Sequence, residues 1–233
     1  MYSFRETVDP DSPGGVRVEV AFTDASVNLQ GRRPGFAADL AAVVERAGVT
    51  FARVSQVHGD EVVHVVDDPA TGPSDDVPSA DALVTSRRGL GLMIRVADCV
   101  PVLLADPVAG VVGAVHSGRI GTTLDVTGKT VARMRSLGAG DITAWIGPHV
   151  CGRCYEVPAQ LRDEVAAVVP ATRSETSWGT PALDLGAGVA AQLAAAGVPA
   201  VLVDRCTLED EQLHSYRRDG AGSGRLAGLV WIP

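Results

Sequence analysis

The chain has 233 residues, and its 28 Asp and Glu against 20 Lys and Arg give a formal net charge of −8. Hydrophobic residues make up 46% of the sequence and charged residues 21%, so there is enough apolar material for a substantial core. Nucleic acids and anionic membranes are bound by basic surfaces, and the acidic balance argues against both kinds of partner. The length fits one large domain or two tightly fused halves, and because no linker divides the chain we predict a single domain over residues 1–233.

The first fifteen residues lack the apolar stretch that a secretory signal needs, and this predicts a cytoplasmic protein. The most apolar region, residues 90–115, contains Arg95, Asp98 and Asp106, which argues against a membrane-spanning helix there. We expect two or three buried strands instead. The four cysteines are expected to stay reduced in this compartment.

In chain order, the residue pattern predicts a half-buried strand at 16–22 and a helix at 35–47 that stops at Gly48. Strands are expected at 51–57 and 61–66, with a turn at His58-Gly59-Asp60 between them. Residues 67–79 are polar and contain proline, which predicts an exposed loop. Four short apolar runs then indicate a central sheet, at 81–85, 89–97, 100–105 and 110–116.

In the second half, helices are expected at 124–137, 158–169 and 183–196, and strands at 142–146, 200–204 and 226–232. The glycine-rich run 220–224 predicts a flexible loop near a site. Strands outnumber helices and do not alternate strictly with them. We therefore predict an α+β fold with mixed sheets flanked by helices, in preference to a doubly wound parallel sheet.

Several common motifs are absent from the sequence. It contains no G-x-x-x-x-G-K-[ST], no complete G-x-G-x-x-G, no H-E-x-x-H and no G-x-S-x-G. These absences leave P-loop, Rossmann and nucleophile-elbow interpretations without support. Two groups of chemically capable residues remain.

The first group is Cys151-Gly152-Arg153-Cys154, with His149 two residues before it. This spacing suits half of a zinc site or a redox pair. The second half of a zinc site, another C-x-x-C or H-x-x-x-H, is missing from the sequence. A thioredoxin-like motif should open a helix, whereas Tyr155 to Pro158 intervene before the next one. The alternative is a loop whose thiols happen to be close.

The second group is His58, Cys99 and His116, each at the end of an apolar run, where functional residues often lie. Two imidazoles and a thiolate suit zinc, and three protein ligands leave the fourth tetrahedral position open, as in catalytic zinc sites. Separations of 41 and 17 residues carry no metal signature of their own. From spacing alone, a lone histidine beside a strand is more often bonded to a backbone carbonyl than to a metal.

Eight segments resemble a known family, and they occur in the family's order. They are Gln56-Val57-His58-Gly59, Asp81-Ala82, Ala97-Asp98-Cys99-Val100-Pro101, Val115-His116-Ser117-Gly118, Trp145-Ile146-Gly147-Pro148, Tyr155-Glu156-Val157, Asp204-Arg205-Cys206-Thr207, and Ser215-Tyr216-Arg217-Arg218-Asp219-Gly220 with Gly224-Arg225. On these motifs the chain is identified as a member of the YfiH or laccase-domain family. Its members are called peptidoglycan editing factors, polyphenol oxidases or multifunctional purine nucleoside phosphorylases.

The resemblance covers nearly the whole chain and implies an α+β fold of stacked mixed sheets with helices outside. It also implies that His58, Cys99 and His116 are the metal-binding and catalytic trio. The metal expected is zinc, with copper as the alternative. Cys206 matches the family's Arg-Cys-Thr strand end, and we expect it in the core.

One motif departs from the family pattern. The family usually reads His-Ala-Gly-Trp-Arg-Gly, and this chain reads His-Ser-Gly-Arg-Ile-Gly from His116. The tryptophan, whose ring would suit stacking on a purine, and the arginine, whose charge would suit phosphate binding, are both replaced in this chain. Arg119 restores a positive charge at the tryptophan position, and Ile120 stands where the arginine is expected.

The resemblance implies a purine enzyme whose partners are a small nucleoside and phosphate. For phosphorolysis of adenosine, inosine or methylthioadenosine, the cations expected to bind phosphate are Arg217, Arg218, Arg225 and Arg119. For deamination of adenosine, zinc would activate water, with Asp98 as a proton carrier or as a partner of Cys99. An aspartate at this position could equally cap a turn.

Three alternatives remain open. A cysteine or metal amidase editing a peptidoglycan precursor would use Cys99 as nucleophile and His116 as base. Copper oxidation of polyphenols fits less well, because a multicopper centre needs many imidazoles and the chain has five, with His64, His149 and His214 ungrouped. A member that binds nucleosides without turnover is the third. The sequence makes no prediction of oligomeric state.

Overall fold

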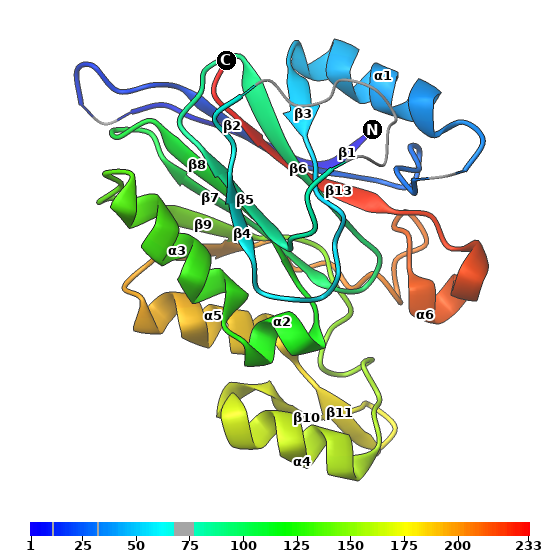
Figure 1. Cartoon of the computed structure of the whole chain (residues 1–233). Coiled ribbons are helices and arrows are strands. Elements are labelled where there is room, and N and C mark those ends of the chain that lie inside the picture. The colour runs from blue at the N-terminus through cyan, green and yellow to red at the C-terminus, as the bar shows by residue number, and fades with distance from the viewer. Residues whose placement is uncertain (11, 32, 68–76) are drawn as a thin grey trace.

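Two β-sheets lie face to face at the centre of the structure, and helices cover their outer faces (Figure 1). The computed structural model describes residues 1–10, 12–31, 33–67 and 77–233. The five-stranded sheet contains, in spatial order, β1 (Tyr2–Val8), β2 (Val18–Thr23), β13 (Leu226–Trp231), β6 (Leu90–Val96) and β3 (Thr50–Ala52). The six-stranded sheet contains β12 (Ala200–Leu202), β9 (Thr143–Ile146), β7 (Val100–Asp106), β8 (Val111–Ser117), β5 (Ala82–Thr85) and β4 (Val62–His64).

Both sheets are mixed. The central strands of each pair antiparallel, while β3 joins β6, β4 joins β5, and β12 joins β9 in parallel at the edges. In the six-stranded sheet, β8 pairs antiparallel with both β7 and β5. The prediction of an α+β fold with stacked mixed sheets and flanking helices is confirmed.

The central strands are buried on both faces, which explains why polar and apolar residues do not alternate in their sequences. In β7, Leu103 faces the five-stranded sheet and packs among residues such as Leu92 and Trp145, whereas Val102 and Leu104 face the helices on the other side. A strand buried on both faces has a continuous apolar sequence. Each such side chain contributes about 1.5–3 kcal/mol by its removal from water.

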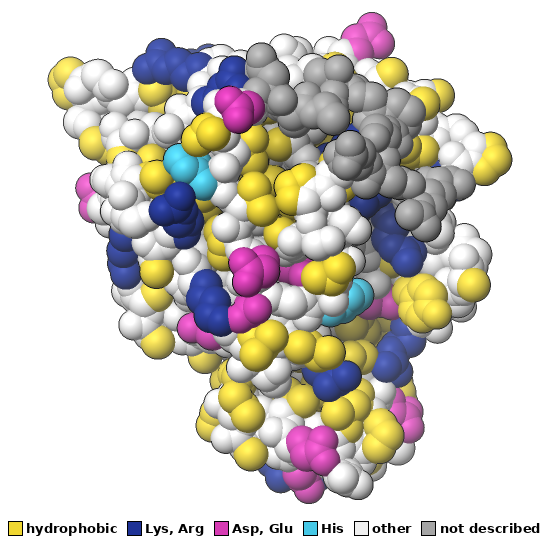
Figure 2. Space-filling model, in the orientation of Figure 1, with side chains coloured by type: hydrophobic (Ala, Val, Ile, Leu, Met, Phe, Trp, Pro, Cys, Tyr) yellow, Lys and Arg dark blue, Asp and Glu magenta, His cyan; other side chains and the backbone are white. Residues whose placement is uncertain are grey.

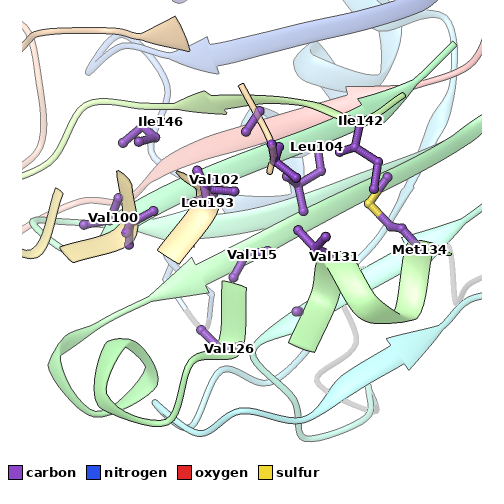
Figure 3. Close-up of a cluster of buried hydrophobic side chains, with 14 of the residues drawn as sticks. Val100, Val102, Leu104, Val115, Val126, Val131, Met134, Ile142, Ile146 and Leu193 are labelled. Atoms are coloured by element: carbon purple, nitrogen blue, oxygen red, sulfur yellow. The ribbon is translucent and has the colours of Figure 1, made fainter. Parts of the chain in front are cut away.

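Three helices cover the outer faces of the sheets: α1 (Phe36–Ala47), α3 (Val126–Ser136) and α5 (Leu185–Ala195). The other helices are α2 (Arg119–Thr123), α4 (Ala159–Val168) and α6 (Tyr216–Asp219). Figure 3 shows Val131 and Met134 of α3 and Leu193 of α5 against Val102 and Leu104 of β7. On the opposite side, α1 packs on the five-stranded sheet (Figure 1).

Some elements differ from those expected. β1, α2 and the hairpin of β10 (Arg173–Glu175) with β11 (Pro181–Leu183) were not predicted. β1 is an edge strand with charged residues, so its sequence lacks the apolar run of a central strand. The strand expected at 51–57 ends at Ala52. Residues 68–76 of the expected loop 67–79 lie outside the described residues.

The apolar region 90–115 forms β6, β7 and most of β8. Among the residues that the structure describes, no helix has both the length and the apolar character needed to cross a membrane.

Candidate functional site

His58, Cys99 and His116 meet in space although they belong to different elements. Cys99 lies in the link that carries the chain from β6 in one sheet to β7 in the other, and His116 is the next-to-last residue of β8. Their possible ligand atoms all lie within 4.8 Å of one another. The two imidazole rings meet edge to face with centroids 4.8 Å apart, and Cys99 Sγ is 3.8 Å from His58 Nε2.

The fully buried Asp81, just before β5, connects two of these residues. Its carboxylate accepts a 2.7 Å hydrogen bond from His116 Nδ1. It also accepts hydrogen bonds from the backbone N–H groups of Val57, His58 and Gly59 at 3.2, 3.0 and 2.6 Å. Because Asp81 is bonded to Nδ1 of His116, Nε2 is the ring nitrogen left to bind a metal once it has lost its proton.

This cradle corrects the prediction that His58 ends a strand. The backbone donors of residues 57–59 bond to Asp81 and not to a neighbouring strand, so the segment after β3 is a loop. His58 adopts a left-handed backbone conformation with φ of 62°, as does Asp98 with φ of 86°. Such conformations are uncommon outside glycine and occur where surrounding contacts enforce them.

Electrostatic coupling separates Cys99 from an ordinary cysteine. Burial alone would raise the pKa of its thiol, but His116 and His58 lower that pKa to about 6. Burial alone would lower the pKa of His116, but Asp81 and Cys99 raise it to about 9. The metal-free site therefore favours a thiolate beside a protonated imidazole at neutral pH. A thiolate is the form of cysteine that binds metal or acts as a nucleophile.

The three residues line a pocket of about 880 Å³, which is in the size range of small-molecule sites. Gly118 keeps the pocket open beside them, because a Cβ there would lie 2.8 Å from His58 Cδ2 and 3.1 Å from Cys99 Sγ. On the face shown in Figure 2, histidine side chains reach the surface near hydrophobic, basic and acidic side chains. Apolar residues such as Val96, Val150 and Leu185 line the pocket together with arginines.

Aromatic and cationic side chains also line the pocket, and they come from segments outside residues 116–121, where the family pattern is changed. The Arg217 guanidinium lies over the Tyr155 ring at 4.6 Å from its centroid. Arg225 lies 5.8 Å from the centroid of Tyr216. All four residues line the pocket. Burial and the nearby Cys99 raise the pKa of Tyr155, which keeps its hydroxyl protonated.

The four predicted arginines are not placed alike. Arg217 and Arg225 line the pocket, while Arg218 and Arg119 are not among its described lining residues. Arg218 donates hydrogen bonds to the carbonyls of Thr207, Asp210 and Leu213 and forms an ion pair with Asp219. Arg119 is the first residue of α2, and within the described part of the chain its guanidinium forms no ion pair.

Asp98 lines the pocket with both carboxylate oxygens already engaged. One accepts a 2.7 Å hydrogen bond from the Thr207 hydroxyl, and the other accepts a 2.6 Å hydrogen bond from the Arg217 backbone N–H. These contacts join the β6–β7 link to the start of α6. Asp98 thereby positions both Cys99, its chain neighbour, and Arg217.

Sequence reasoning did not single out Asp81 or Tyr155 as site residues, although both lie in segments that carry the resemblance. The remaining histidines stay apart from the trio. His149 and His214 bond the carbonyls of Gly147 and Val27, and His64 contacts Arg133. All five histidines are described, and they form no centre with more than two imidazoles.

The cysteine pair at 151 and 154 has a neighbourhood that the sequence did not reveal. Cys206 was expected in the core, but it lies partly buried beside Cys151 and accepts a 3.4 Å hydrogen bond from the backbone N–H of that residue. Burial and the neighbouring thiols raise the pKa of Cys154 above its usual range. The pair therefore lacks the lowered pKa that marks a reactive cysteine.

Comparison with known proteins agrees with this architecture. The model of a family described as multi-copper polyphenol oxidoreductase laccase matches residues 18–233. A Streptomyces griseus protein named purine nucleoside phosphorylase is 56% identical over 186 residues, covering 77% of this chain and 73% of its relative. A Mycobacterium tuberculosis protein of the same name is 48% identical over 198 residues, covering 84% and 77%.

Solved structures give the same result for the fold. YfiH of Bacillus licheniformis superposes with a TM-score of 0.82 at 26% identity, covering 96% of this chain and 98% of that one. YlmD of Geobacillus stearothermophilus has a TM-score of 0.82 at 27% identity, covering 97% and 99%.

Proposed function

We propose that this chain, which belongs to the laccase-domain family of YfiH-like proteins, is a zinc-dependent purine nucleoside phosphorylase that also deaminates adenosine. The observation that carries the proposal is the pocket in which His58, Cys99 and His116 face a Tyr155–Arg217 stack. Relatives named purine nucleoside phosphorylase support it at identities up to 56%. The proposed substrates are adenosine, inosine and methylthioadenosine.

The donor set fits zinc. His58, Cys99 and His116 present two imidazoles and a thiol with a lowered pKa, and Asp81 orients one imidazole as outer-shell partners of metal ligands do. When bound, zinc would supply Lewis-acid activation of water, whose pKa it lowers to about 7. A multicopper centre has less support, because only two imidazoles meet here.

The chain's own residues would handle phosphate and purine. In phosphorolysis, a phosphate oxygen forms a bond to the ribose C1′ while the bond from C1′ to the purine nitrogen breaks. The base leaves with the bonding electron pair and takes up a proton. Among the cations that line the pocket, Arg217 and Arg225 would bind the phosphate dianion, and Arg119 lies near Tyr155. Arg218 is not expected to bind phosphate, because its guanidinium already bonds three backbone carbonyls and Asp219.

The aromatic side chains would hold the base. Tyr155 and Tyr216 line the same pocket and present aromatic faces of the kind that stack on purines. The protonated Tyr155 hydroxyl is available as a hydrogen-bond donor. In this proposal Asp98 keeps its carboxylate on Thr207 and Arg217 and acts as a positioning residue.

Adenosine turnover tests the proposal. We would measure bound metal and the products formed from adenosine with and without phosphate, for the wild type, His58→Ala and Cys99→Ala. The matched control is His64→Ala, which removes a histidine outside the pocket. We expect zinc at the trio, phosphate-dependent adenine release and phosphate-independent inosine formation. The two pocket variants should lose both activities and the zinc of the trio, and the control should keep all three. Bound metal without any nucleoside turnover would reject the purine function.

One observation favours a second candidate. A cysteine whose pKa is lowered to about 6 beside two imidazoles has the arrangement of a thiol nucleophile with its base. In an amidase acting on a peptidoglycan precursor, Cys99 Sγ would form a thioester bond to the amide carbonyl carbon while the amide C–N bond breaks. The amine would leave with a proton from His116. Trapping that acyl group by mass spectrometry, together with turnover that persists after chelation, would select this function.

A further inference from the structure

A second group of metal-binding residue types lies outside the pocket. It consists of Cys151, Cys154, Cys206 and Glu209, whose possible ligand atoms all lie within 4.8 Å of one another. None of the four is among the described residues that line the pocket. The cysteines are free thiols, Cys154 is 3% exposed, and Glu209 is at the surface. Cys206 and Glu209 supply the second half that the local sequence around Cys151 lacks.

We propose that Cys151, Cys154, Cys206 and Glu209 form a second, structural zinc site that is separate from the His58–Cys99–His116 centre. Three sulfur ligands and one carboxylate match the preference of zinc for thiolate together with nitrogen or oxygen. Four protein ligands complete a tetrahedron and leave no open position, which distinguishes a structural site from a catalytic one. The inference does not depend on the proposed catalytic activity.

The backbone around the cysteines already has the form of a ligand turn. The N–H groups of Cys154 and Tyr155 both donate to the Cys151 carbonyl, at 2.9 and 3.0 Å, and this turn brings the two thiols of the pair together. The Cys151 N–H donates to Cys206 Sγ at 3.4 Å. Hydrogen bonds of this kind orient and stabilise thiolate ligands in metal sites.

The geometry also suits the size of the ion. Zinc–sulfur bonds of about 2.3 Å in a tetrahedron separate the sulfur atoms by about 3.8 Å. The ligand atoms, which lie within 4.8 Å of one another, would need only small side-chain rotations to reach that spacing. The loops themselves are already joined, because His149 and Cys206 form a bridge in which Thr207 N–H donates to the His149 carbonyl at 3.0 Å.

Zinc at this position would fasten two loops that build the pocket wall. The first loop carries Val150 and Tyr155, which line the pocket on either side of the cysteine pair. The second carries Thr207, whose hydroxyl bonds Asp98. The Val150 N–H also donates to the Asp98 carbonyl at 3.0 Å. The second site would therefore hold in place the residues that position Tyr155 and the Cys99 link.

Metal counting on the intact chain tests the proposal. Each protein is reduced, loaded with excess zinc, freed of unbound metal and analysed for zinc per chain. We expect one equivalent in Cys99→Ala, where the catalytic centre is broken and the second group is untouched. Cys99→Ala combined with Cys154→Ser should hold none. A Cys99→Ala protein that is folded, reduced and free of zinc would overturn the proposal.

Cys154 is buried, so Cys154→Ser could lose zinc simply by misfolding. Changes at exposed glutamates test the site without that risk. In the Cys99→Ala background, Glu209→Gln should weaken zinc binding by about tenfold or more, whereas the exposed neighbour change Glu211→Gln should leave it unaltered. Cobalt bound in place of zinc should give the charge-transfer absorption of three thiolates, reduced in Cys206→Ser. Equal zinc affinity in the two glutamate variants would overturn the four-ligand site.

Discussion

Asp81 bonds the ring of His116 at 2.7 Å while its other contacts hold the backbone of the loop that carries His58. One fully buried carboxylate therefore sets the orientation of one predicted metal ligand and the position of another. Burial alone would raise its pKa, but the hydrogen bonds from His116 and from the Gly59 and Val57 backbone lower it. Asp81 is thus held as an anion that supports both histidines.

Replacing Asp81 tests this coupling. Asp81→Asn removes the anion from His116 and leaves an amide group facing backbone N–H donors, so we expect about a 10- to 100-fold loss of zinc affinity at the trio. Zinc affinity is measured by competition with a chelator. The zinc held by Cys99→Ala is subtracted as background, because that variant binds zinc only at the second site. Asp60→Asn is the control, because Asp60 pairs with Lys129 near the surface. Unchanged zinc affinity in Asp81→Asn would contradict the role given to this residue.

Gly118 tests whether open space beside the trio matters. Its backbone φ of −85° suits alanine, so Gly118→Ala adds only a methyl group close to His58 and Cys99. Displacement of catalytic groups by this methyl should lower kcat/KM for adenosine on the order of 100-fold. Gly140→Ala, where nothing lies within 4 Å of the added Cβ, should keep full activity. Equal kcat/KM values in the two variants would show that the space is not used.

Arg217 and Arg218 are adjacent in sequence, but replacing them should affect different properties. Arg217→Ala should weaken phosphate binding, and Arg218→Ala should lower stability. Arg217→Ala removes the cation stacked on Tyr155, and we expect KM for phosphate to rise about tenfold or more with little change in unfolding free energy. Arg218→Ala removes donors to three backbone carbonyls and should lower the free energy of unfolding by about 1–3 kcal/mol. Phosphate kinetics and denaturant unfolding of both variants decide the matter. A phosphate-binding defect in Arg218→Ala alone would reverse the assignment.

Asp106 should contribute a pH-dependent part of the stability. Burial alone would raise its pKa, but hydrogen bonds from the backbone N–H groups of residues 108, 109, 140 and 141 lower it. A depressed folded-state pKa adds stability above the unfolded value of about 3.9, and this stability is lost as the pH falls through the folded value. Asp106→Asn should therefore be destabilised at pH 7 by about 1–3 kcal/mol, with the deficit shrinking in acid. Urea unfolding at several pH values measures it, with the exposed Asp141→Asn as control.

Most elements of the fold could be predicted from local sequence. The runs at 89–97, 100–105 and 110–116 became β6, β7 and β8, because a strand buried on both faces must be apolar throughout. The helix ending at Gly48 was equally clear, since glycine at the helix C-terminus adopts a left-handed conformation at little cost. β1 was missed, because its charged residues face solvent at an edge of the sheet.

The residue types of the site were readable in sequence, but their partners were not. His58, Cys99 and His116 were recognised from their chemistry and the family resemblance, whereas Asp81 gave no local sign that it would bond His116. The pairing of Ala82 with Val115 places Asp81 beside His116, and this pairing exists only in the folded sheet. Side chains far apart in sequence meet through strand register, which depends on how whole strands pair and not on the residues next to Asp81 or His116.

The cysteines show the same division. The sequence by itself determined that Cys151 and Cys154 would lie close together, because two intervening residues allow a single turn to join them. Only the tertiary structure brought Cys206 to the pair from 55 residues away from Cys151, through the bridge between residues 149 and 206. Short-range geometry is set by the chain's own turns, whereas a four-ligand site and a shared pocket wall require loops whose positions are set by the packed sheets.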